Sequence, residues 1–89
     1  MSARKERNDL RLSAAKVIKN ARTLAGVSQI RLAQLLVISQ PLVSAWECGK
    51  VTPGIDDVAR IEQVLDTEQG SLLFAIAYPH NKRNNEYRS

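Results

Sequence analysis

The sequence contains few of the residues on which metal sites, disulfides and β-structure depend. One cysteine and one histidine are too few for a zinc site or an internal disulfide. The chain has four glycines and 4% aromatic residues, a composition that favours an all-α protein over a β-sandwich or a β-barrel. We therefore expect an all-α domain without a metal or another cofactor.

Long apolar runs are also missing. No run approaches the roughly 20 residues that a membrane-spanning helix needs, and the charged N-terminus is not followed by the apolar stretch of a signal peptide. The single thiol, Cys48, and the single imidazole, His80, are far apart in the sequence, which is a poor basis for nucleophilic catalysis. The sequence thus predicts a cytoplasmic protein that is not an enzyme, with no catalytic residues, membrane contact or small-molecule ligand.

The net charge of +4 is unevenly distributed along the chain. Residues 12–53 carry five basic side chains against one acidic side chain, whereas residues 54–78 carry one basic side chain against five acidic ones. Such a polarity would turn one end of the domain toward a polyanion and the other end away from it. Chance also produces uneven charge in a protein of 89 residues, so charge alone leaves both interpretations open.

Apolar spacing and helix caps predict five helices in one domain. These are expected over residues 12–24, 28–36, 39–49 and 55–65, and from residue 67 or 71 up to Pro79. Ser28 and Ser39 are suitable N-caps for the second and third helices. Residues 1–11 lack apolar periodicity and are predicted to form a flexible basic arm, and residues 79–89 a polar tail. The folded domain is thus expected over residues 12–78.

The second and third helices are separated by a very short turn. Their sequence, over residues 28–50, is SQIRLAQLLVISQPLVSAWECGK. Two such helices make a helix-turn-helix, whose second helix can enter the major groove of DNA. A scaffold helix would favour Lys or Glu where this one has Gln40, Ser44 and Ala45. Because Gln pairs with adenine edges and Ala contacts thymine methyl groups, the pattern indicates base recognition, although other helix pairs share the spacing.

Four sequence features coincide with a known family. They are SQ at the start of the second helix, LA at residues 32–33, SAWE-x-GK at the end of the third helix, and Pro53 before the fourth. Over roughly residues 16–73 the chain thereby resembles phage repressors and Cro proteins, the XRE-type helix-turn-helix regulators. The resemblance implies a lambda-repressor-like domain of five helices that binds operator double-stranded DNA, usually as a homodimer on a palindrome. Phage switch proteins and restriction-modification controllers both fit this description.

The resemblance also implies roles for individual residues. Those facing base edges would be Gln40, Pro41, Ser44 and Ala45. Those contacting phosphate would be Ser28, Gln29, Lys50 and Thr52, together with Lys19 and Arg31. Arg22 and Glu47 stand at positions that form an internal ion pair in this family, and Trp46 stands at a buried position.

Three residues depart from the family pattern. Val37 stands where a glycine is usual in the turn, and a β-branched residue at positive φ predicts strain or an altered turn. Pro41 has no polar side chain for base contact, and Cys48 replaces a residue that commonly contacts phosphate. These departures predict modest direct readout, with some specificity arising from DNA shape or from the N-terminal arm.

Two segments outside the helix-turn-helix carry further expectations. The arm contains Arg4, Lys5 and Arg7, which either contact DNA or belong to a leader without a role. The fifth helix is apolar on more than one side, which favours a homodimer surface over burial in one core. Its apolar residues, assigned to that surface, are Leu72, Leu73, Phe74, Ile76 and Tyr78.

Two functions therefore remain open. The first is a sequence-specific regulator of transcription, most simply a repressor that acts as a homodimer. The alternative is a protein-interaction module such as an antitoxin, in which the acidic fourth helix and the apolar fifth helix form the working surface and DNA binding is secondary. Co-purification of a small partner protein would favour the alternative.

Overall fold

The computed structural model describes residues 2–79, with side chains from Leu10 onward. In these residues there are five helices and no strand, so the predicted all-α class with five helices is confirmed. The helices are α1 (Ser2–Leu24), α2 (Gln29–Leu36), α3 (Gln40–Glu47), α4 (Ile55–Val64) and α5 (Ser71–Ala77). The expected tail lies almost wholly outside the described residues.

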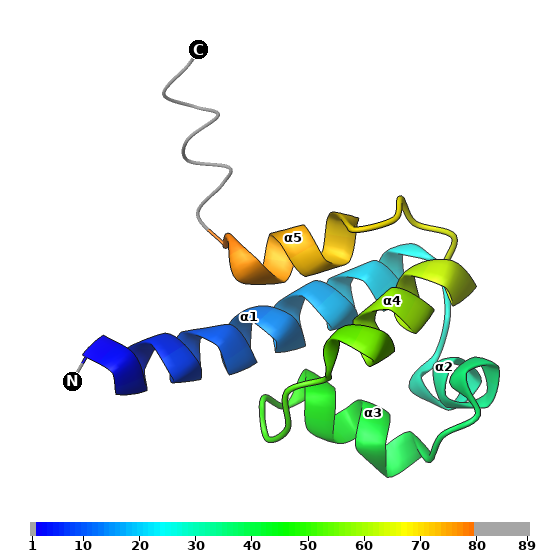
Figure 1. Cartoon of the computed structure of the whole chain (residues 1–89). Coiled ribbons are helices and arrows are strands. Elements are labelled where there is room, and N and C mark those ends of the chain that lie inside the picture. Colours follow the sequence, from blue (N-terminus) through cyan, green and yellow to red (C-terminus); the bar gives the residue numbers. More distant parts are fainter. Residues whose placement is uncertain (1, 80–89) are drawn as a thin grey trace.

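The longest helix, α1, is the element around which the others are arranged. It packs against α5 on one side and against α3 on another, while α2 contacts both α3 and α4 (Figure 1). The apolar core between these helices is formed by residues from all five. Its most deeply buried large side chains are Trp46, Ile18, Leu32, Leu36, Ile61 and Val43. Trp46 is thus a core residue, as the sequence indicated.

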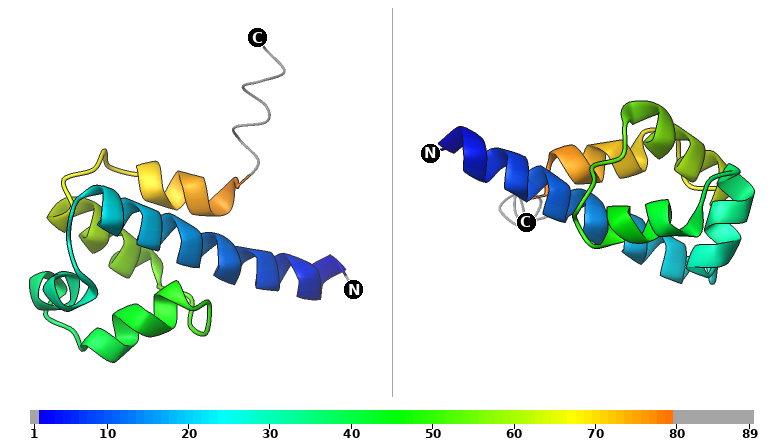
Figure 2. Two further views of the ribbon diagram at one scale, coloured as in Figure 1. Left: turned by 180° about the vertical axis from the view of Figure 1, so that it is seen from behind. Right: turned by 90° about the horizontal axis from the view of Figure 1, so that it is seen from below.

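The start of α1 differs from the sequence prediction. The helix begins at Ser2 rather than at Leu12, and its N-terminal part extends beyond the other helices (Figure 2). Apolar periodicity does not detect such an extension, because no other element covers it. Elongating an existing helix is far easier than nucleating a new one, and residues 2–11 contain neither Gly nor Pro. The backbone of the expected arm is therefore helical.

The turn between α2 and α3 keeps a left-handed residue although no glycine is present. Val37 is the C-cap of α2 with φ of 59° and ψ of 49°, and its side chain is 84% exposed. The guanidinium of Arg60 donates a hydrogen bond to the carbonyl of Leu36, immediately before this residue. Of the two outcomes expected at Val37, the structure therefore shows strain and not an altered turn.

The last helix is held by two contacts with other elements. The Ser13 hydroxyl in α1 donates a hydrogen bond of 2.9 Å to the carbonyl of Ile76. The buried carboxylate of Glu62 accepts hydrogen bonds from the backbone N–H groups of Gly70, Leu72 and Leu73, at 2.8, 2.9 and 3.3 Å. These N–H groups lie at the N-terminal end of α5, where helical partners are lacking. The carboxylate thus caps α5 from α4.

Part of the predicted dimer surface is wrong. Leu72 and Ile76 are buried in the core of a single chain, because one side of α5 packs on α1 and α4. Leu73, Phe74 and Tyr78 remain exposed. These three residues are the large apolar side chains at α5 that are available to another molecule.

Candidate nucleic-acid interface

The starts of α2 and α3 are fixed by the two serines that the sequence predicted as caps. The Ser28 hydroxyl accepts a hydrogen bond of 3.0 Å from the backbone N–H of Arg31, and the Ser39 hydroxyl accepts one of 3.3 Å from Leu42. Pro41 lies in the first turn of α3, where a missing N–H is tolerated. The Ser28 hydroxyl therefore has a role within the fold, in addition to the phosphate contact expected of it.

The outward face of α3 brings together the four residues expected to read bases. Val43 and Trp46 point into the core, so that side chains about half a helical turn away face outward. Pro41 is exposed, and Gln40, Ser44 and Ala45 are half-buried. The resulting surface combines one amide, one hydroxyl and small apolar groups, a composition suited to base edges in a major groove.

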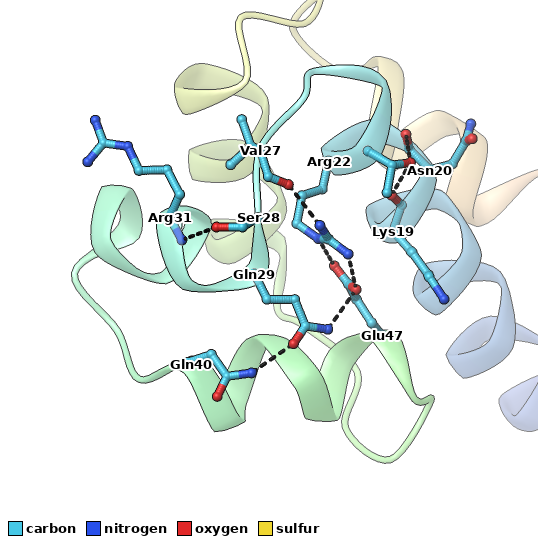
Figure 3. Close-up of polar contacts among 10 residues, drawn as sticks. Lys19, Asn20, Arg22, Val27, Ser28, Gln29, Arg31, Gln40 and Glu47 are labelled. Carbon is cyan, nitrogen blue, oxygen red and sulfur yellow. Dashed lines mark hydrogen bonds and ion pairs between the residues drawn. The ribbon is translucent and has the colours of Figure 1, made fainter.

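The side chain of Gln40 is held by a partner in α2. Its Nε2 donates a hydrogen bond of 2.7 Å to Oε1 of Gln29, and Nε2 of Gln29 donates one of 3.0 Å to Oε1 of Glu47 (Figure 3). Each glutamine is the first residue of its helix, which is why the two side chains meet where α2 and α3 approach each other. Gln40 is consequently oriented before any DNA is present.

The chain of hydrogen bonds ends in an ion pair between α1 and α3. Arg22 donates to both oxygens of Glu47, from Nε at 2.7 Å and from Nη2 at 2.9 Å, and from Nη1 to the carbonyl of Val27 at 2.8 Å. The two side chains are only 10% and 3% exposed. Such bidentate, charge-assisted pairs are among the stronger hydrogen-bonded contacts in proteins. The pair implied by the family resemblance is thus present and ties the end of α1 to the end of α3.

Both charges of this pair are favoured by their surroundings. Burial raises the pKa of the Glu47 carboxyl, but hydrogen bonds from Arg22 and Gln29 and the charges of Arg22 and Lys19 outweigh it, so that the pKa lies below its ordinary value of 4.5. The hydrogen bond to Glu47 raises the pKa of Arg22 despite desolvation. Glu47 therefore carries a full negative charge at neutral pH and can only accept hydrogen bonds.

The cationic and polar side chains expected to contact phosphate lie on α1, on α2 and just after α3. Lys19 is exposed on α1 and close enough to Glu47 to influence its ionisation. Lys50 and Thr52 are exposed just after α3. Arg31 is exposed on α2, where its Nη1 donates to Oε1 of Gln34 at 3.3 Å. The residues expected at phosphates thus lie on three elements, and none of them is buried.

Metal clusters and membrane-spanning helices are not found in the part of the chain that the structure describes. Between residues 10 and 79, no three His, Cys, Asp or Glu side chains are grouped so that they could hold a metal ion. Within the same range, no helix combines the length and apolar character needed to cross a bilayer.

The arrangement of α2 and α3 agrees with a match to a known family. Residues 18–68 match the sequence model of the helix-turn-helix family, which is more than half of the chain. The chain belongs to this family. The match supports the XRE, lambda-repressor-like type, so the protein is a DNA-binding transcriptional regulator. Comparisons with curated proteins and with solved structures found no significant match.

In this helix-turn-helix regulator, sequence reasoning placed Gln29 and Gln40 in separate roles and missed their contact. It assigned Gln29 to phosphate and Gln40 to base edges; in the structure the amide of Gln40 donates to that of Gln29, and the amide of Gln29 donates to Glu47. The available signal was that a polar amide begins each of two helices joined by a short turn. The cap that Glu62 provides for α5 was also missed, because the sequence offers no indication that this carboxylate is buried.

Proposed function

We propose that this protein is a transcriptional repressor that binds a palindromic operator as a homodimer and inserts α3 into successive major grooves. The observation that carries the proposal is the outward face of α3, where Gln40 is held by Gln29, in the part of the chain that carries the exposed cations Lys19, Arg31 and Lys50. A preformed polar group in a basic part of the domain suits DNA, whose backbone supplies affinity and whose base edges supply specificity.

The residues divide into two groups under this proposal. Gln40 and Ser44 read base edges by hydrogen bonds, and Ala45 and Pro41 offer apolar contact to thymine methyl groups. Phosphates are bound by the exposed cations and by polar groups near the start of α2. These residues are Lys19, Ser28, Gln29, Arg31, Lys50 and Thr52. Only two of the base-facing side chains are polar, so DNA shape contributes to specificity.

The basic N-terminal residues belong to the helical extension of α1. The backbone is helical from Ser2, so Arg4, Lys5 and Arg7 are part of one helix with the domain. We infer that these residues strengthen DNA binding by contact with phosphates. Cations on an extension of the domain raise affinity without adding base specificity.

The exposed surface of α5 supports the homodimer. Leu73, Phe74 and Tyr78 are exposed, and the rings of Phe74 and Tyr78 lie 4.9 Å apart and are tilted. Contiguous exposed apolar residues of this kind are typical of protein–protein contacts. A two-fold contact through them would present two α3 helices, and helix-turn-helix dimers meet half-sites about 34 Å apart. A cytoplasmic repressor of the phage-switch or restriction-modification type would use this arrangement.

The same surface of α5 supports a second candidate function. If Leu73, Phe74 and Tyr78 bind a different protein, the chain is an antitoxin-like module in which DNA binding is secondary. Purification from the native host distinguishes the repressor from the antitoxin-like module. The module requires that a partner protein co-purify with this chain in equal molar amount.

The deciding experiment is the selection of bound sites from random double-stranded DNA by the full chain, followed by footprinting of the selected sequence. A repressor dimer selects an inverted repeat and protects both halves, one helical turn apart. Selection of no sequence over background would contradict the proposed function. Selection of a single asymmetric half-site would keep DNA recognition but contradict the dimer.

A further inference from the structure

A groove with a volume of about 380 Å³ lies between α1 and α5, beside the end of α4. Most of the side chains that line it are apolar. They include Val17, Ala21 and Leu24 on α1, Leu65 just after α4, and Leu72 and Ala75 on α5. None of the five described helices fills this groove, so it offers an apolar recess to a further segment.

Polar and charged groups gather at the α4 end of the groove. Its lining includes the amide of Asn20 and the hydroxyl of Thr67. The Thr67 hydroxyl donates a hydrogen bond of 3.4 Å to the carbonyl of Glu62, and its oxygen can still accept one. The exposed residues Asp66 and Glu68 directly precede and follow Thr67. An apolar recess with hydrogen-bonding groups and nearby negative charge suits a tyrosine on a basic segment.

The groove differs from the surface proposed for the dimer. Leu73, Phe74 and Tyr78 do not line it. In addition, α5 and α3 pack on different sides of α1 (Figure 1). An occupant of the groove therefore needs to cover neither the exposed apolar residues of α5 nor the outward face of α3.

The chain itself contains a segment with the required composition. Residues 80–89, which lie outside the described residues, hold three basic side chains against one acidic side chain, and Tyr87 is their only large apolar residue. Tyr87 follows Pro79 by eight residues, a stretch that reaches about 26 Å when extended. The seven residues of α5 span only about 10 Å. The chain can therefore turn back after α5 and bring Tyr87 to the groove.

We propose that residues 80–89 dock in the groove between α1 and α5, with the ring of Tyr87 against its apolar wall and the Tyr87 hydroxyl at Asn20 or Thr67. Transfer of the ring out of water stabilises the docked segment, and the covalent tether gives it an effective concentration in the millimolar range. The basic side chains of the segment then lie near Asp66 and Glu68 rather than at DNA phosphates. This docking does not depend on DNA recognition.

The test is NMR of the full chain without DNA. The methyl resonances of Val17 and Leu24 report on an aromatic ring in the groove, and those of Val43, in the core beside α3, serve as a reference. Tyr87→Ser should shift the two groove resonances, because the magnetic field of the ring is lost, and leave Val43 unchanged. Tyr87→Phe and Asn85→Ser, which keep an aromatic ring at residue 87, should resemble the wild type. Unchanged groove resonances in Tyr87→Ser would overturn the proposal.

Two further measurements test the energetics of docking. Tyr87→Ser should lower the melting temperature by about 4–8 °C relative to Asn85→Ser, because the groove loses its occupant. Arg88→Glu should move the groove resonances in the same direction as Tyr87→Ser, because it places a like charge near Asp66 and Glu68. Equal melting temperatures of Tyr87→Ser and Asn85→Ser would contradict a docked ring.

The remaining outcomes concern other locations of the same segment. Docking within one chain predicts that the difference between wild type and Tyr87→Ser does not depend on protein concentration. A difference that disappears on dilution would show that the segment occupies the groove of a second copy and would overturn the proposal. Deletion of residues 80–89 should leave the slope of log DNA affinity against log salt unchanged. A slope lowered by about two to three would place the basic residues on phosphates instead.

Discussion

The carboxylate of Glu62 accepts a hydrogen bond of 2.9 Å from the backbone N–H of Leu72, so α4 caps the first turn of α5. We expect Glu62→Gln to destabilise the domain by about 1–3 kcal/mol, because an amide accepts fewer of the three N–H groups and adds a donor among donors. Urea unfolding measures this loss. Glu68→Gln, the same change at an exposed position, is the control, and equal stabilities of the two variants would contradict the cap.

The ion pair predicts how stability depends on pH. The pKa of Glu47 in the folded state lies below its ordinary value of 4.5. The stability that the ionised carboxylate gives to the fold is therefore fully present above pH 4.5. It is lost as the pH falls through the folded-state pKa. Glu47→Gln should be less stable than wild type by about 3 kcal/mol at neutral pH. The difference between the two unfolding free energies should shrink as the pH falls below 4.5 and vanish only below the folded-state pKa of Glu47. A difference that persists unchanged down to pH 3 would show that Glu47 is not ionised in the pair.

Base contacts and phosphate contacts should respond differently to substitution. Gln40→Ala should weaken binding to the selected site by about 1–3 kcal/mol and relax preference at one base pair. Lys50→Ala should weaken binding to all sequences alike and lower the slope of log affinity against log salt by about one. Titrations on selected and random duplexes at several salt concentrations measure both. Identical behaviour of the two variants would refute the assignment.

The exposed surface of α5 predicts the state of assembly. Phe74 is 49% exposed, so Phe74→Glu should leave a folded monomer with weak operator affinity, whereas the wild type forms a dimer at least on DNA. Leu24→Glu is the control, because Leu24 is an exposed apolar residue at the end of α1 rather than on α5. Light scattering and footprinting measure the two properties. A wild-type protein that stays monomeric on DNA would refute the dimer.

The turn at Val37 predicts a gain in stability. A left-handed conformation strains a β-branched residue by about 1–2 kcal/mol, and glycine removes this strain while adding about 0.5–1 kcal/mol of chain entropy cost. Val37→Gly should therefore raise the unfolding free energy by about 0.5–1 kcal/mol, measured by urea unfolding. Val51→Gly, at a residue without positive φ, should lower it. A loss of stability in Val37→Gly would show that the turn is not strained.

Local features of the fold were predictable from the sequence, and tertiary ones only in part. The serine caps of α2 and α3 depend on neighbouring residues and were predicted correctly. The extension of α1 was not, because an uncovered helix has no apolar period. Leu72 and Ile76 were misplaced because periodicity does not show which side of an apolar helix the core covers.

In the candidate site, too, local features were predictable from the sequence and tertiary contacts were not. Residue types and spacing on α3 predicted which side chains face outward. The bonds that connect Gln40, Gln29 and Glu47 depend on how three helix ends meet, and spacing along the chain does not give that distance. The Arg22–Glu47 contact was anticipated only through the family resemblance.

The strained turn at Val37 also bears on how this domain can acquire a new target. Substitutions on the outward face of α3 alter recognition, and most substitutions in a folded domain lower its stability. A domain close to its stability threshold tolerates few of them. Val37 lies at the end of α2 and outside the proposed recognition face, so replacing it with glycine would offset part of such losses. Glycine at this position would therefore let the domain tolerate more substitutions on the outward face of α3.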